Sequence, residues 1–126
     1  MGKGFNVVIA DDDPDIRGLL EIAARRAELT IVSSHGEGGG ALAATLDTDP
    51  DLLILDVSMP VMTGLEVVHE LRASRHDGRP YVLLVSASVN PSALAAGKSA
   101  GADDYVMKPF TLSSLVERLR GIQDTL

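Results

Sequence analysis

Residues 6–14 read NVVIADDDP, a short apolar run that ends in three aspartates and a proline. The run does not alternate between apolar and polar positions, which is typical of a strand covered on both faces. Asp13 before Pro14 predicts the start of a helix, because aspartate caps helix N-termini and proline fits the first turn. The stretch therefore predicts a buried strand that leads directly into a helix, the repeating unit of a parallel sheet.

The same unit recurs along the rest of the chain. Further short apolar runs occupy residues 30–33, 52–55, 81–85 and 105–107. The helical signals between and after them are apolar spacing over 16–27 and 112–122, a short apolar stretch over 41–46, a capping box at 63–66 and an Asn-Pro start at 90–91. Five strand–helix repeats predict one α/β domain over residues 1–126, a three-layer sandwich around a five-stranded parallel sheet with five helices. The glycines at 36 and 38–40 lead us to expect a second helix that is short or mobile.

Composition excludes several classes of protein. The chain has 126 residues, a formal charge of −7 and no cysteine, so a disulfide framework or a cysteine-ligated metal site is ruled out. No apolar run approaches the roughly 18 residues of a membrane span, and the N-terminal run is too short for a signal peptide. We expect a cytoplasmic protein without membrane contact. The acidic balance also disfavours direct nucleic-acid binding, which needs clustered lysine and arginine.

Polar residues stand at the carboxyl ends of the predicted strands, where sites form in parallel sheets. They are Asp11, Asp12, Ser33, Ser34, Asp56, Ser86 and Lys108. Each of them alone has a plain structural explanation, such as a solvated turn, a strand-end serine or an exposed lysine. Their convergence on one edge of the sheet is what predicts a site.

The acidic residues of this edge predict a cation. If Asp12 and Asp56 face each other near 4 Å, they repel by about 4 kcal/mol at an effective dielectric constant of ~20. Mg²⁺ would remove this repulsion, since it binds carboxylate oxygens and keeps waters for a phosphate partner. Lys108 offers a point charge to a phosphate, and Ser86 beside Ala87 offers a hydroxyl with room for a bulky anion. The Lys108-Pro109 sequence also favours a cis peptide bond.

Three segments carry a resemblance to a known family. They are VIADDDP at 8–14, LDVSMP at 55–60 with Gly64, and GADDYVMKPF at 101–110. In this order they resemble the receiver domain of two-component response regulators, over essentially the whole chain. The resemblance implies a flavodoxin-like fold with strand order 2-1-3-4-5. A stand-alone regulator, a phosphorelay intermediate and a receiver from a longer protein share these motifs, and the sequence leaves the three open.

The resemblance also implies a role for each site residue. Asp56 would accept a phosphoryl group from a phosphohistidine on a histidine kinase or histidine phosphotransfer protein. Mg²⁺ would be bound by Asp11, Asp12, Asp56 and the carbonyl of Ser58. Lys108 and Ser86 would bind the phosphoryl group. Ser86 and Tyr105 would form the switch. The switch would alter a surface that binds a downstream protein target. An ordinary aspartate pKa near 3.9 would leave Asp56 ionised at pH 7 without a general base.

Two other functions compete with this interpretation. A phosphatase with an aspartyl-phosphate intermediate would carry a second acid two residues after its nucleophile, where this chain has Ser58. A nucleotide-binding enzyme is suggested by the G-x-G-x-x-A pattern at 36–41, but that pattern follows the second predicted strand. The Gly-Lys-Ser at 97–99 resembles the end of a P-loop but lies in an alanine-rich helix. We therefore expect no enzyme activity beyond the chain's own phosphoryl transfer and dephosphorylation.

The sequence leaves two further features open. Ser58 and Ser88 are small hydroxyl residues near the expected phosphoryl group, and such positions influence water access and the lifetime of the acyl phosphate. A phosphorylation-dependent homodimer would be consistent with a pair between Arg118 and Asp103 or Asp104 of a second copy.

Overall fold

The computed structural model describes residues 4–75 and 77–126. Its centre is a five-stranded parallel sheet in the order β2-β1-β3-β4-β5. The strands are β1 (Asn6–Ala10), β2 (Thr30–His35), β3 (Leu52–Asp56), β4 (Tyr81–Ser86) and β5 (Asp104–Met107). The helices are α1 (Pro14–Arg26), α2 (Gly38–Thr48), α3 (Gly64–Ser74), α4 (Pro91–Ala100) and α5 (Leu112–Thr125). The predicted fold class and strand order are confirmed.

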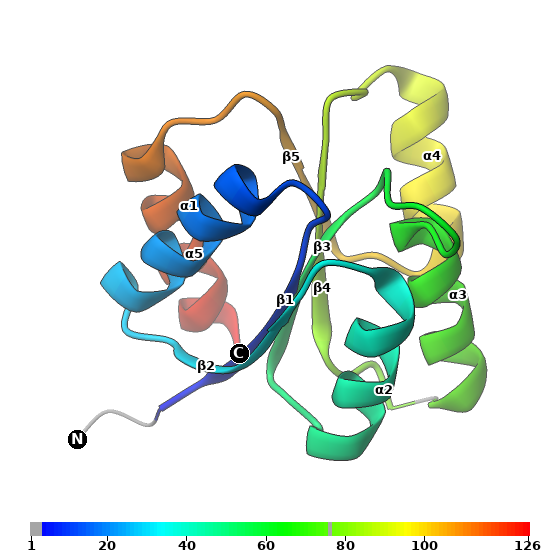
Figure 1. Cartoon of the computed structure of the whole chain (residues 1–126), viewed down its shortest axis with the longest axis horizontal. Helices are drawn as coiled ribbons and strands as arrows, with labels where there is room; N and C mark the ends of the chain where they lie inside the picture. Colours follow the sequence, from blue (N-terminus) through cyan, green and yellow to red (C-terminus); the bar gives the residue numbers. More distant parts are fainter. Residues whose placement is uncertain (1–3, 76) are drawn as a thin grey trace.

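The helices cover both faces of the sheet. Figure 1 shows α1 and α5 on one side and α2, α3 and α4 on the other. Val7 and Ile9 of β1 belong to the apolar core beneath α1 and α5, whereas Val8 and Ala10 belong to the opposite core. Because successive strand residues point to opposite faces, a strand between two cores must be apolar at every position. This is why the decisive run of β1 does not alternate.

Three predicted helix starts are confirmed by their caps. The Asp13 side chain accepts from the backbone N–H groups of Asp15 and Ile16 at the start of α1. Asn90 caps α4 ahead of Pro91, and Thr63 forms the expected capping box of α3. The Lys108-Pro109 peptide bond is cis, as expected.

The second helix differs from the prediction. It spans 11 residues, as many as α3, and begins within the glycines. The Glu37 side chain caps it by accepting from the backbone N–H of Gly40. A Cβ at Gly38 would lie 2.5 Å from the carbonyl oxygen of Met62, so the missing side chain lets α2 pack closely beside the segment before α3. Of the expectation that this helix is short or mobile, the first part was wrong, and Gly38 serves a close contact with the segment before α3.

Neighbouring strands end at nearly the same level, at the carboxyl edge of the sheet. Ala10 is in register with Leu55 of β3, and Ser86 with Met107 of β5. The loops that leave β1, β3, β4 and β5 therefore start side by side. Along residues 4–75 and 77–126, no helix is both long and apolar enough to span a membrane.

Candidate functional site

The loop after β1 is held by the backbone and side chain of Asp11. Its N–H donates to the carbonyl oxygen of His35 over 3.1 Å, which continues the pairing of β1 with β2. Its Oδ1 accepts from the N–H of Asp13 at 2.9 Å. Asp11 is fully buried, whereas Asp12 beside it is exposed. The loop thus offers one buried and one accessible carboxylate to the same edge.

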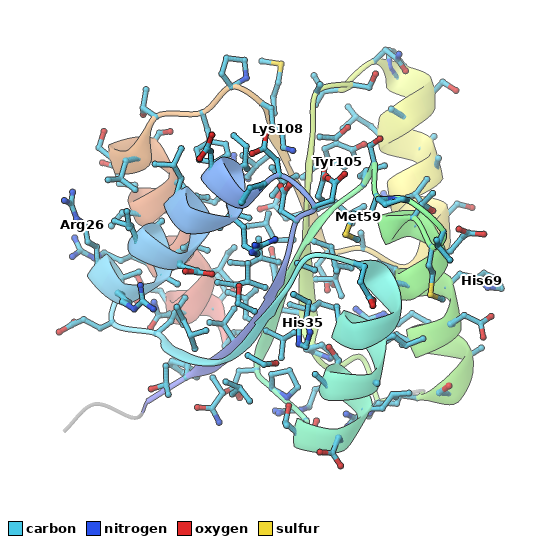
Figure 2. The ribbon with its side chains drawn as sticks, viewed as in Figure 1. Arg26, His35, Met59, His69, Tyr105 and Lys108 are labelled. Carbon is cyan, nitrogen blue, oxygen red and sulfur yellow. The ribbon has the colours of Figure 1, made fainter. Side chains whose placement is uncertain are left out.

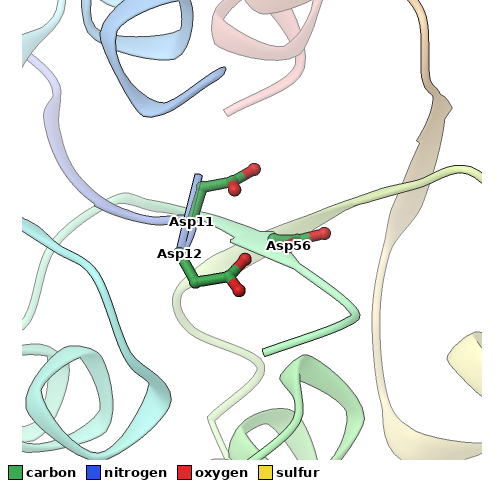
Figure 3. A group of neighbouring side chains, drawn as sticks. All are labelled: Asp11, Asp12 and Asp56. Carbon is green, nitrogen blue, oxygen red and sulfur yellow. The ribbon is translucent and has the colours of Figure 1, made fainter. Parts of the chain in front are cut away.

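Asp56 completes an acidic cluster with these two residues. One carboxylate oxygen each from Asp11, Asp12 and Asp56 lies within 4.8 Å of the others. Figure 3 shows the three side chains near one another at the ends of β1 and β3, extending toward the same side. At such distances like charges repel strongly, which raises the free energy of the metal-free fold unless a cation intervenes.

Lys108 supplies one cation from the end of β5, at the same edge of the sheet (Figure 2). Its Nζ lies 3.1 Å from Asp11 Oδ2 and 3.1 Å from Asp56 Oδ1. Three ionised carboxylates and one ammonium leave a net charge of −2. Asp11 Oδ2, although ion-paired, accepts no hydrogen bond of good geometry within the described residues. The oxygen donors and the uncompensated charge fit a divalent oxygen-loving cation such as Mg²⁺.

Burial changes the acidity of the cluster. Burial raises the pKa of Asp56 from 3.8 to about 6. The negative charge of Asp11 also raises this pKa, whereas the hydrogen bond from Lys108 lowers it. Burial lowers the pKa of Lys108, but the hydrogen bond to Asp56 and the charges of Asp11 and Asp56 together outweigh burial, so the pKa is raised. The expectation of an ordinary pKa for Asp56 was therefore wrong. Its carboxylate still predominates about tenfold over the acid at pH 7.

The loop after β3 is shaped by two backbone contacts. The N–H of Ser58 reaches Asp56 Oδ1 at 3.4 Å, and the N–H of Gly64 donates to the carbonyl oxygen of Val57 at 2.9 Å. A Cβ at Gly64 would lie 2.3 Å from the carbonyl oxygen of Asp56. Glycine there lets the start of α3 close directly over the end of β3.

Ser86 and Tyr105 are linked through the backbone of Ser88. Ser86 Oγ accepts from the N–H of Ser88 at 3.0 Å, and the Tyr105 hydroxyl donates to the carbonyl oxygen of Ser88 at 3.2 Å. The Tyr105 ring packs on α4, where a Cβ at Gly97 would lie 2.9 Å from Cε2. The three residues form a chain of contacts from the end of β4 to α4.

Two residues predicted at this edge bond elsewhere. Ser34 Oγ donates to Glu21 Oε2 on α1 at 2.6 Å, and Ser33 Oγ lies 2.8 Å from His35 Nε2. Both hydroxyls satisfy partners around β2, which is an edge strand and runs two residues further than its apolar signal predicted.

In a single copy, the residues suggested for a pair across a dimer form ion pairs within the chain. Arg118 Nη1 lies 2.8 Å from Asp104 Oδ2, and Asp103 pairs with Arg72. Both acidic residues named for a contact between two copies therefore already have an arginine partner in one copy.

Arg17 of α1 was missed by the sequence reasoning. Its Nη1 donates to the carbonyl oxygen of Asp11 at 2.8 Å. The only available signal was its place on the first turn of the helix that follows the aspartates. Such a place does not distinguish a functional arginine from an ordinary surface arginine.

The chain is similar to known proteins over most of its length. The family model of the response regulator receiver domain matches residues 7–120. The chain is 40% identical over 121 residues to the probable transcriptional regulatory protein TcrX of Mycobacterium tuberculosis, covering 96% of this chain and 50% of TcrX. It is also 40% identical over 114 residues to the DNA-binding response regulator MtrA of Mycolicibacterium smegmatis, covering 90% of this chain and 48% of MtrA.

A solved structure shows the same architecture. The chemotaxis response regulator CheY4 of Vibrio cholerae superposes with a TM-score of 0.85 at 28% identity, covering 98% of this chain and 100% of CheY4. The chain spans about half the length of the curated relatives it matches. With the family model matched over most of its length, the chain belongs to the response regulator receiver domains of two-component signal transduction.

Proposed function

We propose that Asp56 accepts a phosphoryl group from a phosphohistidine in a magnesium-dependent step and thereby switches a protein-binding surface. The donor is a histidine kinase or a histidine phosphotransfer protein. The observation that carries the proposal is the position of Lys108 Nζ, 3.1 Å from both Asp11 and Asp56 in a cluster that keeps a net charge of −2. Such a site needs a divalent cation and can then receive the oxygens of a phosphoryl group.

The residues that would hold Mg²⁺ are Asp11, Asp12, Asp56 and the backbone carbonyl of Ser58. When bound, the ion supplies charge neutralisation for the phosphoryl oxygens. Lys108 supplies a second cation to the same oxygens from β5. Phosphoryl transfer depends mostly on alignment and charge neutralisation, and this edge of the sheet would supply both once Mg²⁺ is bound.

The transfer itself needs only the Asp56 carboxylate as nucleophile. A carboxylate oxygen forms a bond to phosphorus while the bond from phosphorus to the histidine nitrogen breaks. The electron pair leaves with the imidazole, and the product on this chain is an acyl phosphate. Because the carboxylate predominates at pH 7, no general base is required.

The switch follows from the charge that the phosphoryl group adds. A carboxylate of charge −1 becomes a group of about −2 with three acceptor oxygens. The Ser86 hydroxyl can donate to these oxygens, and its movement would disturb the bond that it accepts from Ser88. Tyr105 is bonded to the same residue, so the displacement reaches the Tyr105 ring and α4. This chain of contacts is a local two-state element biased by charge.

The test is phosphorylation with and without Mg²⁺. Wild-type protein incubated with a phosphorylated histidine kinase is expected to gain one phosphoryl group per chain, and only with Mg²⁺. Asp56→Asn should gain none, whereas the exposed control Asp124→Asn should behave as wild type. Label on Asp56→Asn would refute the assignment. Many turnovers of a phosphomonoester per chain would favour the phosphatase alternative.

The partners of this chain are also part of the proposal. We propose that the receiver signals by contact with a downstream protein, in the cytoplasm, without itself touching nucleic acid or membrane and without turnover of other substrates. MtrA is named as a DNA-binding response regulator and is about twice as long as the matched region. A homodimer that forms on phosphorylation is compatible with this scheme.

A further inference from the structure

Arg17 makes an unusual contact for an arginine on the first turn of a helix. Instead of extending into solvent, it is half-buried and folds back over the loop that precedes α1. Its Nη1 donates to the carbonyl oxygen of Asp11 at 2.8 Å. That carbonyl belongs to the peptide group that joins Asp11 to Asp12, so a charged donor restrains the orientation of this peptide plane.

The restraint matters because few other contacts fix the orientation of Asp12. Asp11 is fixed by its N–H bond to His35, by the bond from Asp13 and by Lys108. The Asp12 carboxylate is exposed, and within the described residues no hydrogen bond or ion pair holds it. Its direction therefore depends on the backbone on either side of it. On one side, that backbone is the peptide held by Arg17.

A glycine on the neighbouring loop leaves room for the guanidinium. Gly36 follows β2, and a Cβ built there would lie 3.0 Å from Arg17 Nη1. The φ angle of Gly36 lies outside the left-handed region, so alanine would fit its backbone without strain. Packing against the guanidinium is thus the constraint that a side chain at position 36 would violate.

We propose that Arg17 is a positioning residue for the divalent cation. It orients the peptide between Asp11 and Asp12 so that the Asp12 carboxylate meets those of Asp11 and Asp56 around one ion. The inference rests on the proposed function only in taking this cluster as a Mg²⁺ site. Outer contacts that orient metal ligands commonly change metal affinity by one or two orders of magnitude.

The sign of the effect separates positioning from simple charge. A positive charge close to the cluster repels a divalent cation, so loss of charge alone would tighten Mg²⁺ binding. Loss of orientation would weaken it. A role confined to stability would lower the melting temperature and leave the Mg²⁺ affinity of the folded protein unchanged.

The experiment is a calorimetric titration of the metal-free chain with Mg²⁺, without any phosphodonor and well below the melting temperature. We expect Arg17→Ala to raise the dissociation constant about tenfold. The matched control Arg25→Ala removes the same charge from the exposed last turn of α1 and should leave the dissociation constant within about twofold of wild type, since screened surface charges act weakly. Unchanged or tighter binding by folded Arg17→Ala would overturn the proposal.

Gly36→Ala provides a second variant that keeps every charge. Its methyl group should press the guanidinium away from the Asp11 carbonyl and weaken Mg²⁺ binding to a smaller extent. If Arg17→Ala does not fold, this variant decides, and an affinity equal to wild type would reject the inference. Failure of the phosphorylation test on a chain that binds Mg²⁺ normally would count against the proposed function and leave the role of Arg17 standing.

Discussion

Asp56 is only 3% exposed at the end of β3, and its charge is incompletely balanced there. Burial raises its pKa to about 6, which means that the metal-free fold favours the protonated form more than the unfolded chain does. In that case the folded state binds the extra proton between about pH 4 and pH 6. The stability of the metal-free protein should therefore fall as pH rises through this range.

Replacing Asp56 should remove this cost. Asp56→Asn is expected to raise the free energy of unfolding of the metal-free protein at pH 7.5 by about 1–3 kcal/mol, the upper value being the full pKa difference. The gain should shrink as pH falls toward 4, where both states of the wild type become protonated. Chemical denaturation at several pH values measures it, with Asp124→Asn as the exposed control. A gain independent of pH would contradict the assigned pKa.

Lys108 should have opposite effects on stability and on cation binding. Lys108→Met leaves Asp11 and Asp56 without their shared cation, so the metal-free protein should lose about 1–3 kcal/mol at pH 7.5. The same change makes the cluster more negative, and Mg²⁺ should bind more tightly and recover much of the loss. Denaturation with and without Mg²⁺ measures both effects. The exposed Lys98→Met on α4 is the control, and equal losses in the two conditions would refute the prediction.

At the scale of single elements, several glycines set how closely the helices approach the sheet and each other. At Gly38, Gly64 and Gly97 an added Cβ would meet a neighbour at 2.9 Å or less. Each of these positions lies on a helix that borders the site or its switch. Helix propensity alone would penalise glycine here, so tertiary contact overrides the local preference.

Gly97 and Gly121 make this argument testable. Gly97→Ala would place a methyl group 2.9 Å from the Tyr105 ring and 3.1 Å from Leu84, and should destabilise the protein by about 1–3 kcal/mol through overpacking. Gly121→Ala on α5 has nothing within 4 Å and should stabilise by about 0.5–1 kcal/mol. Thermal unfolding compares the pair. Stabilisation by Gly97→Ala as well would show that α4 packs differently on Tyr105.

At the scale of the whole molecule, the site joins loops that the sheet brings together from distant parts of the chain. Asp11 and Asp12 follow β1, Asp56 is the last residue of β3, and Lys108 follows β5. A cation held between the first two loops ties β1 to β3 at their carboxyl ends. Cation binding should thus be linked to global unfolding, since the unfolded chain cannot hold these carboxylates together.

The linkage predicts a stability that depends on Mg²⁺ concentration. At one hundred times its dissociation constant, Mg²⁺ should raise the free energy of unfolding by about 2.7 kcal/mol. The gain should diminish below pH 6, because protons then compete for Asp56. Melting curves in Mg²⁺ and in KCl of equal ionic strength measure it, and Asp12→Asn should lose most of the gain. A similar gain in KCl would attribute the effect to screening.

The sequence by itself determined the strand and helix pattern, because periodicity and caps act over a few residues. Asp13, Asn90 and Thr63 start helices wherever they stand before suitable partners, and the buried runs of β1, β3 and β4 require two covered faces. Parallel pairing then places Asp11, Asp12, Asp56 and Lys108 at one edge, so these candidates also follow from the chain.

Tertiary structure decided what depends on neighbours far away in the chain. The raised pKa of Asp56 comes from burial and from the charge of Asp11. The Ser34 hydroxyl donates a hydrogen bond to Glu21 on α1 and not to the site. The glycines at the start of α2 belong to an 11-residue helix, and Met62 lies against Gly38. Arg17 contacts Asp11 because α1 folds back over its own entrance loop. Desolvation, steric fit and charge balance depend on the three-dimensional surroundings of a residue, and local sequence patterns do not encode them.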